Sequence, residues 1–170
     1  LKYPFNIIFA RTKAVAYAKY IGVRIAGKVT IYGSSYEMFG SEPYLVSIDD
    51  NAFISVGVKF VTHDGSVLPF RASFPDLDLA APIHIGANTF IGMHAVILKG
   101  VKIGENCVVG ACSVVTKSVP AGSIVVGNPA RVLTTTAEFL EKAKANSLKI
   151  GNLPEMEKHA AYKKHFKIEA

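Results

Sequence analysis

The chain of 170 residues has no tryptophan and two cysteines, and its apolar runs are short. Because a membrane-spanning helix needs roughly 20 consecutive apolar residues, we expect no stable membrane insertion. Cys107 and Cys112 form neither a C-x-x-C pair nor a Cys/His cluster, which argues against a disulfide framework or a zinc finger. The first residues also lack the three-part pattern of a secretory signal, so a cytoplasmic protein is predicted.

The balance of charge is positive, with a formal net charge of +6. Such a balance favours an anionic partner. The lysines and arginines are dispersed, with neither a basic run nor a recognisable nucleic-acid-binding motif. We therefore predict no nucleic-acid binding and prefer a phosphorylated small molecule as the anionic partner.

An aliphatic residue returns at every sixth position through the centre of the chain. This column consists of Ile85, Ile91, Ile97, Ile103, Val109 and Val115. The positions four residues later hold mostly small residues, namely Thr89, Ala95, Val101, Cys107, Ser113 and Val119. A six-residue period fits no helix, and it is typical of a β-helix in which short strands stack coil upon coil. We predict an all-β fold in which the aliphatic residue points into a narrow prism.

The same rhythm occurs upstream, but two segments interrupt it. Its upstream members are Ile25, Ile31, Ile48, Ile54 and Phe60. The interruptions cover residues 33–44 and 62–82. Insertions of this length must leave the prism, and long loops on a rigid scaffold are where functional residues concentrate. Residues 63–82 are therefore predicted to form an extruded loop.

Segments of different composition flank the repeats. Residues 1–20 have helical spacing of apolar residues, with Asn6 as the expected N-cap, and are predicted to close one end of the prism. The β-helix is predicted over residues 21–133. Residues 134–170 form a tail with two expected helices, one starting after Thr135 or Thr136 and the other near residues 155–166.

The repeats, together with T62-H-D-G and G127-N-P-A-R-V, resemble the hexapeptide-repeat acyltransferases. Within that family the chain is most similar to the sugar and xenobiotic acetyltransferases typified by galactoside and maltose acetyltransferases. The resemblance spans about residues 21–133 and implies a left-handed parallel β-helix. It also implies acetyl-CoA as co-substrate, no metal, and a homotrimer with active sites between subunits. The implied acceptor is a hydroxyl, or less readily an amine, of a sugar, nucleotide sugar, polysaccharide or antibiotic.

The resemblance also implies roles for residues beside the acceptor. A loop histidine is the family's general base, and His63 matches it. A neutral imidazole suits this role because it can take a proton as the nucleophile attacks. Glu42 matches a position that contacts the acceptor. Arg71 either meets an anionic acceptor or pairs with Asp76 or Asp78.

A second set of residues is expected to contact acetyl-CoA, namely Phe90, Met93, Ala111, Thr116, Lys117 and Arg131. Phe90 stands where many relatives have tryptophan beside the pantetheine arm, and the amide of Met93 is the expected oxyanion donor. Arg131 matches the basic residue near the 3′-phosphate, since a guanidinium holds phosphate well. The alternative for Lys117 is an ordinary solvated surface charge. Asp64 is not expected to orient His63, because adjacent side chains diverge on extended backbone.

Three other functions are compatible with a β-helix in general. A carbonic anhydrase of the γ type needs three zinc-binding histidines, two of them about one hexapeptide apart. Here His84 and His94 are ten apart and His63 lies far upstream, so the spacing fails. A non-catalytic spacer has no use for a long loop that begins with histidine. Transfer from acyl carrier protein is less favoured, because the relatives that use it carry a larger C-terminal helical domain.

Overall fold

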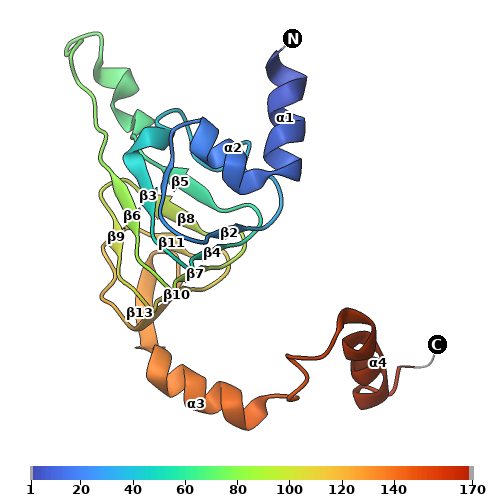
Figure 1. Ribbon diagram of the computed structural model, residues 1–170. Helices are drawn as coiled ribbons and strands as arrows, with labels where there is room; N and C mark the ends of the chain where they lie inside the picture. The colour runs from blue at the N-terminus through green and yellow to red at the C-terminus, as the bar shows by residue number, and fades with distance from the viewer. Residues whose placement is uncertain (1, 169–170) are drawn as a thin grey trace. The chain divides into compact units, whose positions relative to one another are not determined.

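The computed structural model describes residues 2–168, and the chain divides into two units, Leu1–Thr136 and Ala137–Ala170. Among the described residues, the first unit contains two α-helices, two short 3-10 helices and all the strands (Figure 1). The second unit contains α4 (Glu155–His165) and all but the first residue of α3 (Thr136–Asn146). No helix within residues 2–168 has the length and apolar character that crossing a bilayer requires.

Short strands form three sheets that make the sides of a prism. Sheet A contains β1 (Arg24–Ile25), β3 (Val46–Ile48), β6 (Ile83–Ile85) and β9 (Lys102–Ile103). Sheet B contains β2 (Thr30–Ile31), β4 (Phe53–Ile54), β7 (Phe90–Ile91), β10 (Val108–Val109), β12 (Ser123–Gly127) and β13 (Ala130–Thr135). Sheet C contains β5 (Lys59–Val61), β8 (Val96–Leu98) and β11 (Val114–Val115). From β3 to β11 the chain visits A, B and C in turn, which makes it a parallel β-helix and confirms that part of the predicted fold.

The predicted aliphatic column forms the core of this prism. Ile85, Ile91, Ile97, Ile103 and Val109 are 0% exposed, and Val115 is 1% exposed. The small residues four positions later are buried as well. Parallel pairing in register, for example Ile54 with Ile91 and Ile91 with Val109, places each core side chain over the one below. Complete burial of one such side chain contributes roughly 1.5–3 kcal/mol, so the repeat itself supplies much of the stability.

The bends of the prism need unusual backbone. The first corner, from sheet A to sheet B, has Asn51, Asn88 and Asn106 with φ near 55°, a conformation that asparagine tolerates better than most residues.

At the second corner, from sheet B to sheet C, a Cβ on Gly92 would lie 2.6 Å from the backbone nitrogen of Ala111. Only glycine lets these two coils approach so closely.

Two helices cover the N-terminal end of the prism. Helix α1 (Lys2–Thr12) begins before Asn6, so the predicted N-cap is wrong. Pro4 is compatible with this earlier start because the first turn of a helix needs no N–H from that residue. After a break at Lys13, α2 (Ala14–Tyr20) continues to the first coil. The Ser35 hydroxyl donates to the carbonyl of Ala14 at 2.9 Å and so ties the helices to the prism.

The C-terminal end of the prism is a strand reversal. The parallel stack ends with β12, and β13 folds back antiparallel to it from Ala130 to Thr135. Residue 133, the predicted end of the β-helix, lies within β13. Gly127, with φ of 98°, and the cis Asn128–Pro129 peptide make the reversal. The motif G-N-P-A-R-V is thus a hairpin turn.

Candidate active site

Both interruptions of the repeat leave the prism at the same bend, the third corner, which leads from sheet C to sheet A. The first interruption reaches β3 through residues 39–45, and the second reaches β6 through residues 62–82. The backbone N–H of Phe60 donates to the carbonyl of Met38 at 2.8 Å, which places Met38, within the first interruption, beside β5. In the next coil the same bend needs only residues 99–101. The two insertions therefore lie one coil apart at one edge.

The longer insertion is an ordered hairpin at its base. His63 and Ala80 form an antiparallel bridge, and the backbone N–H of Asp64 donates to the carbonyl of Leu79 at 2.8 Å. The predicted loop after His63 is drawn in green in Figure 1, where it projects beyond the strands and contains the short helix η2 (Gly65–Phe70). His63 is thus held on paired backbone at the point where the loop departs.

Contacts within the loop also fix its outer part. Arg71 donates from Nε to the carbonyl of Leu77 at 3.0 Å, and its Nη2 lies 3.2 Å from Oδ1 of Asp78. Of the two roles considered for Arg71, pairing with Asp78 is present in the structure. The guanidinium thereby links the end of η2 to the returning strand of the loop.

His63 and Glu42 meet across the two insertions. Nδ1 of His63 lies 2.7 Å from Oε2 of Glu42, and the Thr62 hydroxyl donates to the same carboxylate oxygen at 2.9 Å. Partial burial raises the pKa of Glu42, but the hydrogen bonds from His63, Thr62 and Ser41 outweigh it, so the pKa lies below its ordinary value. Because an ionised carboxylate only accepts hydrogen bonds, Nδ1 is the donor in this contact, and in the neutral form of the half-exposed ring Nε2 is then an acceptor.

This pair lines a cavity of about 400 Å³. The other lining residues are Ser41, Tyr44, Asp64, Gly65, Leu68, Arg71, Asp78 and Ala80. All three residues predicted to lie near the acceptor, His63, Glu42 and Arg71, therefore share one cavity. The contact between His63 and Glu42 could not be predicted from sequence spacing, since it depends on both insertions leaving at the same corner.

Asp64 has a different partner, as its place on extended backbone implies. Its Oδ2 lies 2.9 Å from Nζ of Lys99, and its Oδ1 accepts from the backbone N–H of Ser66 at 3.0 Å. The hydrogen bond from Lys99, followed by those from Ser66, holds the pKa of Asp64 well below its usual range. Lys99, which sequence reasoning missed, thus anchors the loop base to the next coil.

The residues predicted to contact acetyl-CoA do not gather around His63 in this chain. Thr116 and Lys117 lie at the third corner, beyond the coil that carries Lys99. Met93 and Ala111 lie at the second corner, where the N–H of Cys112 donates to the carbonyl of Met93 at 2.8 Å. The two groups of residues therefore stand on the two edges that border sheet C.

The other two predicted contacts lie on sheet B. Phe90 is half-exposed on its outer face, in register with Phe53 and Val108. Arg131 is exposed on β13, and its Nη1 donates to the carbonyl of Ala130 at 2.9 Å.

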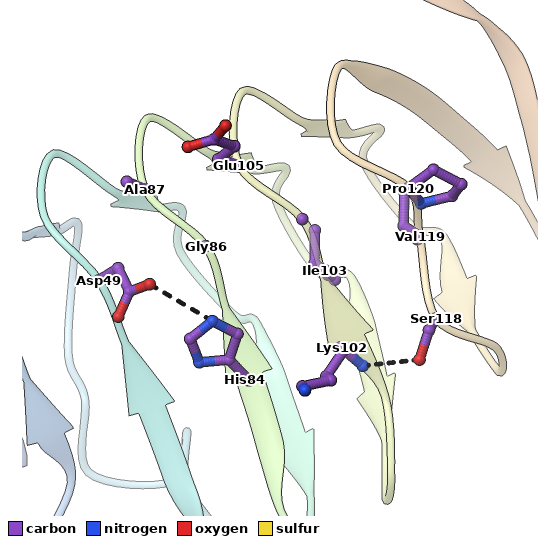
Figure 2. A pocket seen from close by; sticks show the side chains of 11 residues that line it. Asp49, His84, Gly86, Ala87, Lys102, Ile103, Glu105, Ser118, Val119 and Pro120 are labelled. Carbon is purple, nitrogen blue, oxygen red and sulfur yellow. Dashed lines mark hydrogen bonds and ion pairs between the residues drawn. The ribbon is translucent and has the colours of Figure 1, made fainter.

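A separate groove of about 550 Å³ runs along sheet A and the first corner (Figure 2). In it, Nε2 of His84 lies 3.3 Å from Asp49, while Nδ1 lies 3.0 Å from the Ser47 hydroxyl. The backbone N–H of Lys102 donates to the Ser118 hydroxyl at 3.0 Å. Both nitrogens of His84 are therefore engaged by its own face of the prism. Within residues 2–168, no three metal-binding side chains come together.

A known protein family matches the repeats of this chain. The family described as "Bacterial transferase hexapeptide (six repeats)" matches residues 82–117. Protein CapG from Staphylococcus aureus is 42% identical over 127 residues, which cover 75% of this chain and 74% of CapG.

Solved structures with the same architecture include two transferases. A maltose O-acetyltransferase from Clostridium difficile 630 superposes with a TM-score of 0.59 at 23% identity, covering 76% of this chain and 81% of that chain. At this level of identity the likeness concerns the fold alone. AntD, an N-acyltransferase from Bacillus cereus in complex with dTDP and 3-hydroxybutyryl-CoA, has a TM-score of 0.51 at 26% identity, covering 71% of this chain and 73% of that chain.

Proposed function

The chain belongs to the hexapeptide-repeat acyltransferases, and from this membership we propose that it is an acetyl-CoA-dependent O-acetyltransferase with His63 as general base. The proposed acceptor is a hydroxyl of a sugar, a nucleotide sugar or a polysaccharide, and the coil is taken as left-handed, as the family implies. The observation that carries this proposal is the hydrogen bond between His63 and Glu42 in the wall of a cavity. An exposed imidazole with an assigned tautomer is what a general base requires.

The chemistry is a direct acyl transfer. Nε2 of His63 removes the proton of the acceptor hydroxyl as its oxygen attacks the carbonyl carbon of the thioester. The carbonyl oxygen becomes negatively charged in the tetrahedral intermediate, and the backbone N–H of Met93 is the proposed donor to it. The C–S bond then breaks, and the imidazolium returns the proton to the departing sulfur of CoA. Glu42 stabilises the imidazolium between these two steps.

The arrangement of the proposed contacts supports a homotrimer with sites between subunits. A site that needs both groups is completed when the second corner of one subunit meets the third corner of the next. Sheet C would then face the threefold axis. Its outer side chains include Val61, Val96, Leu98 and Val114, and a partly exposed apolar row of this kind suits burial between subunits.

The positive charges of two exposed side chains support acetyl-CoA as the acyl donor. CoA carries several negative charges, and Lys117 and Arg131 are exposed cations on the proposed path of its nucleotide part. The likeness to AntD favours an acyl-CoA donor and makes N-acetylation of an amino sugar or another amine, including an aminoglycoside antibiotic, the second candidate.

The decisive experiment follows release of the CoA thiol from acetyl-CoA. The full chain is incubated with a panel of neutral sugars, amino sugars, nucleotide sugars and aminoglycosides, each with a blank that lacks the acceptor. We expect acceptor-dependent thiol release with a member of the sugar classes, and mass spectrometry then shows whether the acetyl group is on oxygen or nitrogen. Thiol release that no acceptor stimulates would contradict the proposal.

A further inference from the structure

Among the residues that line the cavity, Tyr44 is the one aromatic side chain other than the imidazole of His63. It belongs to the short helix η1 (Pro43–Leu45), which Pro43 anchors by being buried. The N–H of Leu45 donates to the carbonyl of Glu42 at 3.0 Å, so the backbone on either side of Tyr44 is fixed. The Cα and Cβ atoms of Tyr44 lie next to Gly22, where an added Cβ would approach Tyr44 Cβ to 3.5 Å. The residue nevertheless remains 60% exposed.

Each charged side chain that lines the cavity has an oppositely charged partner, except Glu42. Arg71 pairs with Asp78, and Lys99 pairs with Asp64. Glu42 is ionised, and its partner His63 is neutral when it acts as a base. One negative charge therefore remains beside the base, and it repels a carboxylate or phosphate that enters the cavity. A hydroxyl or an ammonium group meets no such repulsion.

We propose that Tyr44 is the surface on which a pyranose ring of the acceptor stacks, and that the cavity accepts a neutral or amino-bearing ring and rejects a uronate. This inference rests on the proposed function and narrows its acceptor class. One face of a pyranose presents C–H groups, which pack against the electron-rich face of an aromatic ring. The hydroxyls at the rim of the sugar can then bond to Ser41 and to Oδ2 of Asp78, since Oδ1 already accepts from the backbone N–H of Leu79 and pairs with Arg71. A tyrosine supplies this surface at a small entropic cost because its side chain has few rotatable bonds.

The chain offers a direct binding test because it contains no tryptophan. Tyr44→Trp keeps an aromatic surface and makes residue 44 the sole indole, so fluorescence reports on that position alone. The probes are the methyl pyranosides of glucose, galactose, mannose and glucosamine. Sorbitol and methyl glucuronide are the comparison ligands, because the first lacks the ring and the second adds a carboxylate.

We expect a saturable change in emission with at least one of the four pyranosides and none with sorbitol or the glucuronide. An equal response to sorbitol, a stronger response to the glucuronide, or no saturable response to any pyranoside would each overturn the inference. This measurement does not depend on acyl transfer. It therefore still decides the role of Tyr44 if the thiol-release assay contradicts the proposed function.

Kinetics provide the second test once an acceptor releases thiol. Loss of one aromatic contact corresponds to about a two- to tenfold effect, so Tyr44→Ala should raise the acceptor KM by that factor. The KM for acetyl-CoA and the kcat should stay within about twofold, and Tyr44→Phe should retain the acceptor KM. Tyr32→Ala is the matched control, because Tyr32 is also an exposed tyrosine of the first coil but does not line the cavity. A fall in kcat with an unchanged acceptor KM would overturn the stacking role.

Discussion

Nδ1 of His63 and Oε2 of Glu42 lie 2.7 Å apart, although the two residues are 21 positions apart in the chain. The contact exists because two successive coils each extend their insertion at the third corner. It gives the imidazole a fixed tautomer before any substrate arrives.

Replacing His63 by alanine should lower kcat by about two to four decades, the usual contribution of one positioned general base. The KM for acetyl-CoA should change little, because the ring acts on the acceptor proton. Steady-state thiol release over a range of acetyl-CoA concentrations measures both constants. Turnover at the original rate would exclude His63 as the base.

Replacing Glu42 by alanine should lower kcat about ten- to hundredfold, since a hydrogen bond to a charged group contributes about 1.5–3 kcal/mol. The same change made in a His63→Ala background should have little further effect, because the two residues act as a unit. Glu37→Ala is the matched control, as Glu37 lies in the same insertion and pairs with Lys59 instead. Additive losses in the double variant would mean that Glu42 acts independently of His63.

Replacing Arg131 by alanine should raise the KM for acetyl-CoA about tenfold, the effect of losing one charge-assisted phosphate contact. The acceptor KM should not change. Arg24→Ala removes an equal charge from the outer face of sheet A and serves as the control. If both variants change the KM equally, the effect reflects net charge and not a contact at Arg131.

Asp64 makes the anchoring of the loop dependent on pH. Its pKa is lower in the folded than in the unfolded protein, because Lys99 and Ser66 stabilise the carboxylate. Its contribution to stability is therefore fully present above the unfolded-state pKa of about 3.9 and is lost as the pH falls below that value. Asp64→Asn should lower the free energy of unfolding at pH 7 relative to the original chain.

The difference between Asp64→Asn and the original chain should shrink as the pH is lowered below about 4. Urea unfolding at a series of pH values measures it. Asp76→Asn removes the same charge elsewhere on the loop and is the control. A difference that persists unchanged in acid would show that the substitution acts through packing.

Replacing Gly92 by alanine should destabilise the prism by about 1–3 kcal/mol, the usual cost of overpacking. The added Cβ would meet the backbone of the next coil at Ala111, which cannot move without separating the two coils. Gly151→Ala is the control, since the space around Gly151 is open for 4 Å. Equal stability of the two variants in urea would show that the coils can shift at no cost.

The core was predictable because a β-helix imposes one local rule many times. Each of the six positions from Ile85 to Val115 follows from counting along the sequence, and all six are buried. The ends were less predictable. The start of α1 before Asn6 and the reversal of β13 depend on backbone geometry for which the six-residue repeat gives no signal.

The site was predictable in its parts but not in its connections. The position of His63 before a long insertion identified the loop. Its contact with Glu42 and the anchoring of Asp64 by Lys99 depend on which residues become neighbours when coils stack. Such neighbours are separated by a whole coil and by insertions of unrelated length. Sequence spacing alone therefore could not show that Glu42 faces the imidazole.

The shared corner of the two insertions also limits how this protein can vary. An extra residue within a strand would turn every later side chain of that strand from the interior to the surface, whereas extra length at a bend leaves the count intact. Residues 99–101 form the same bend in the next coil of the prism. A segment grafted there would lie beside the existing loop and would extend the cavity next to His63 along the axis, which gives protein engineers a place to change what that cavity binds.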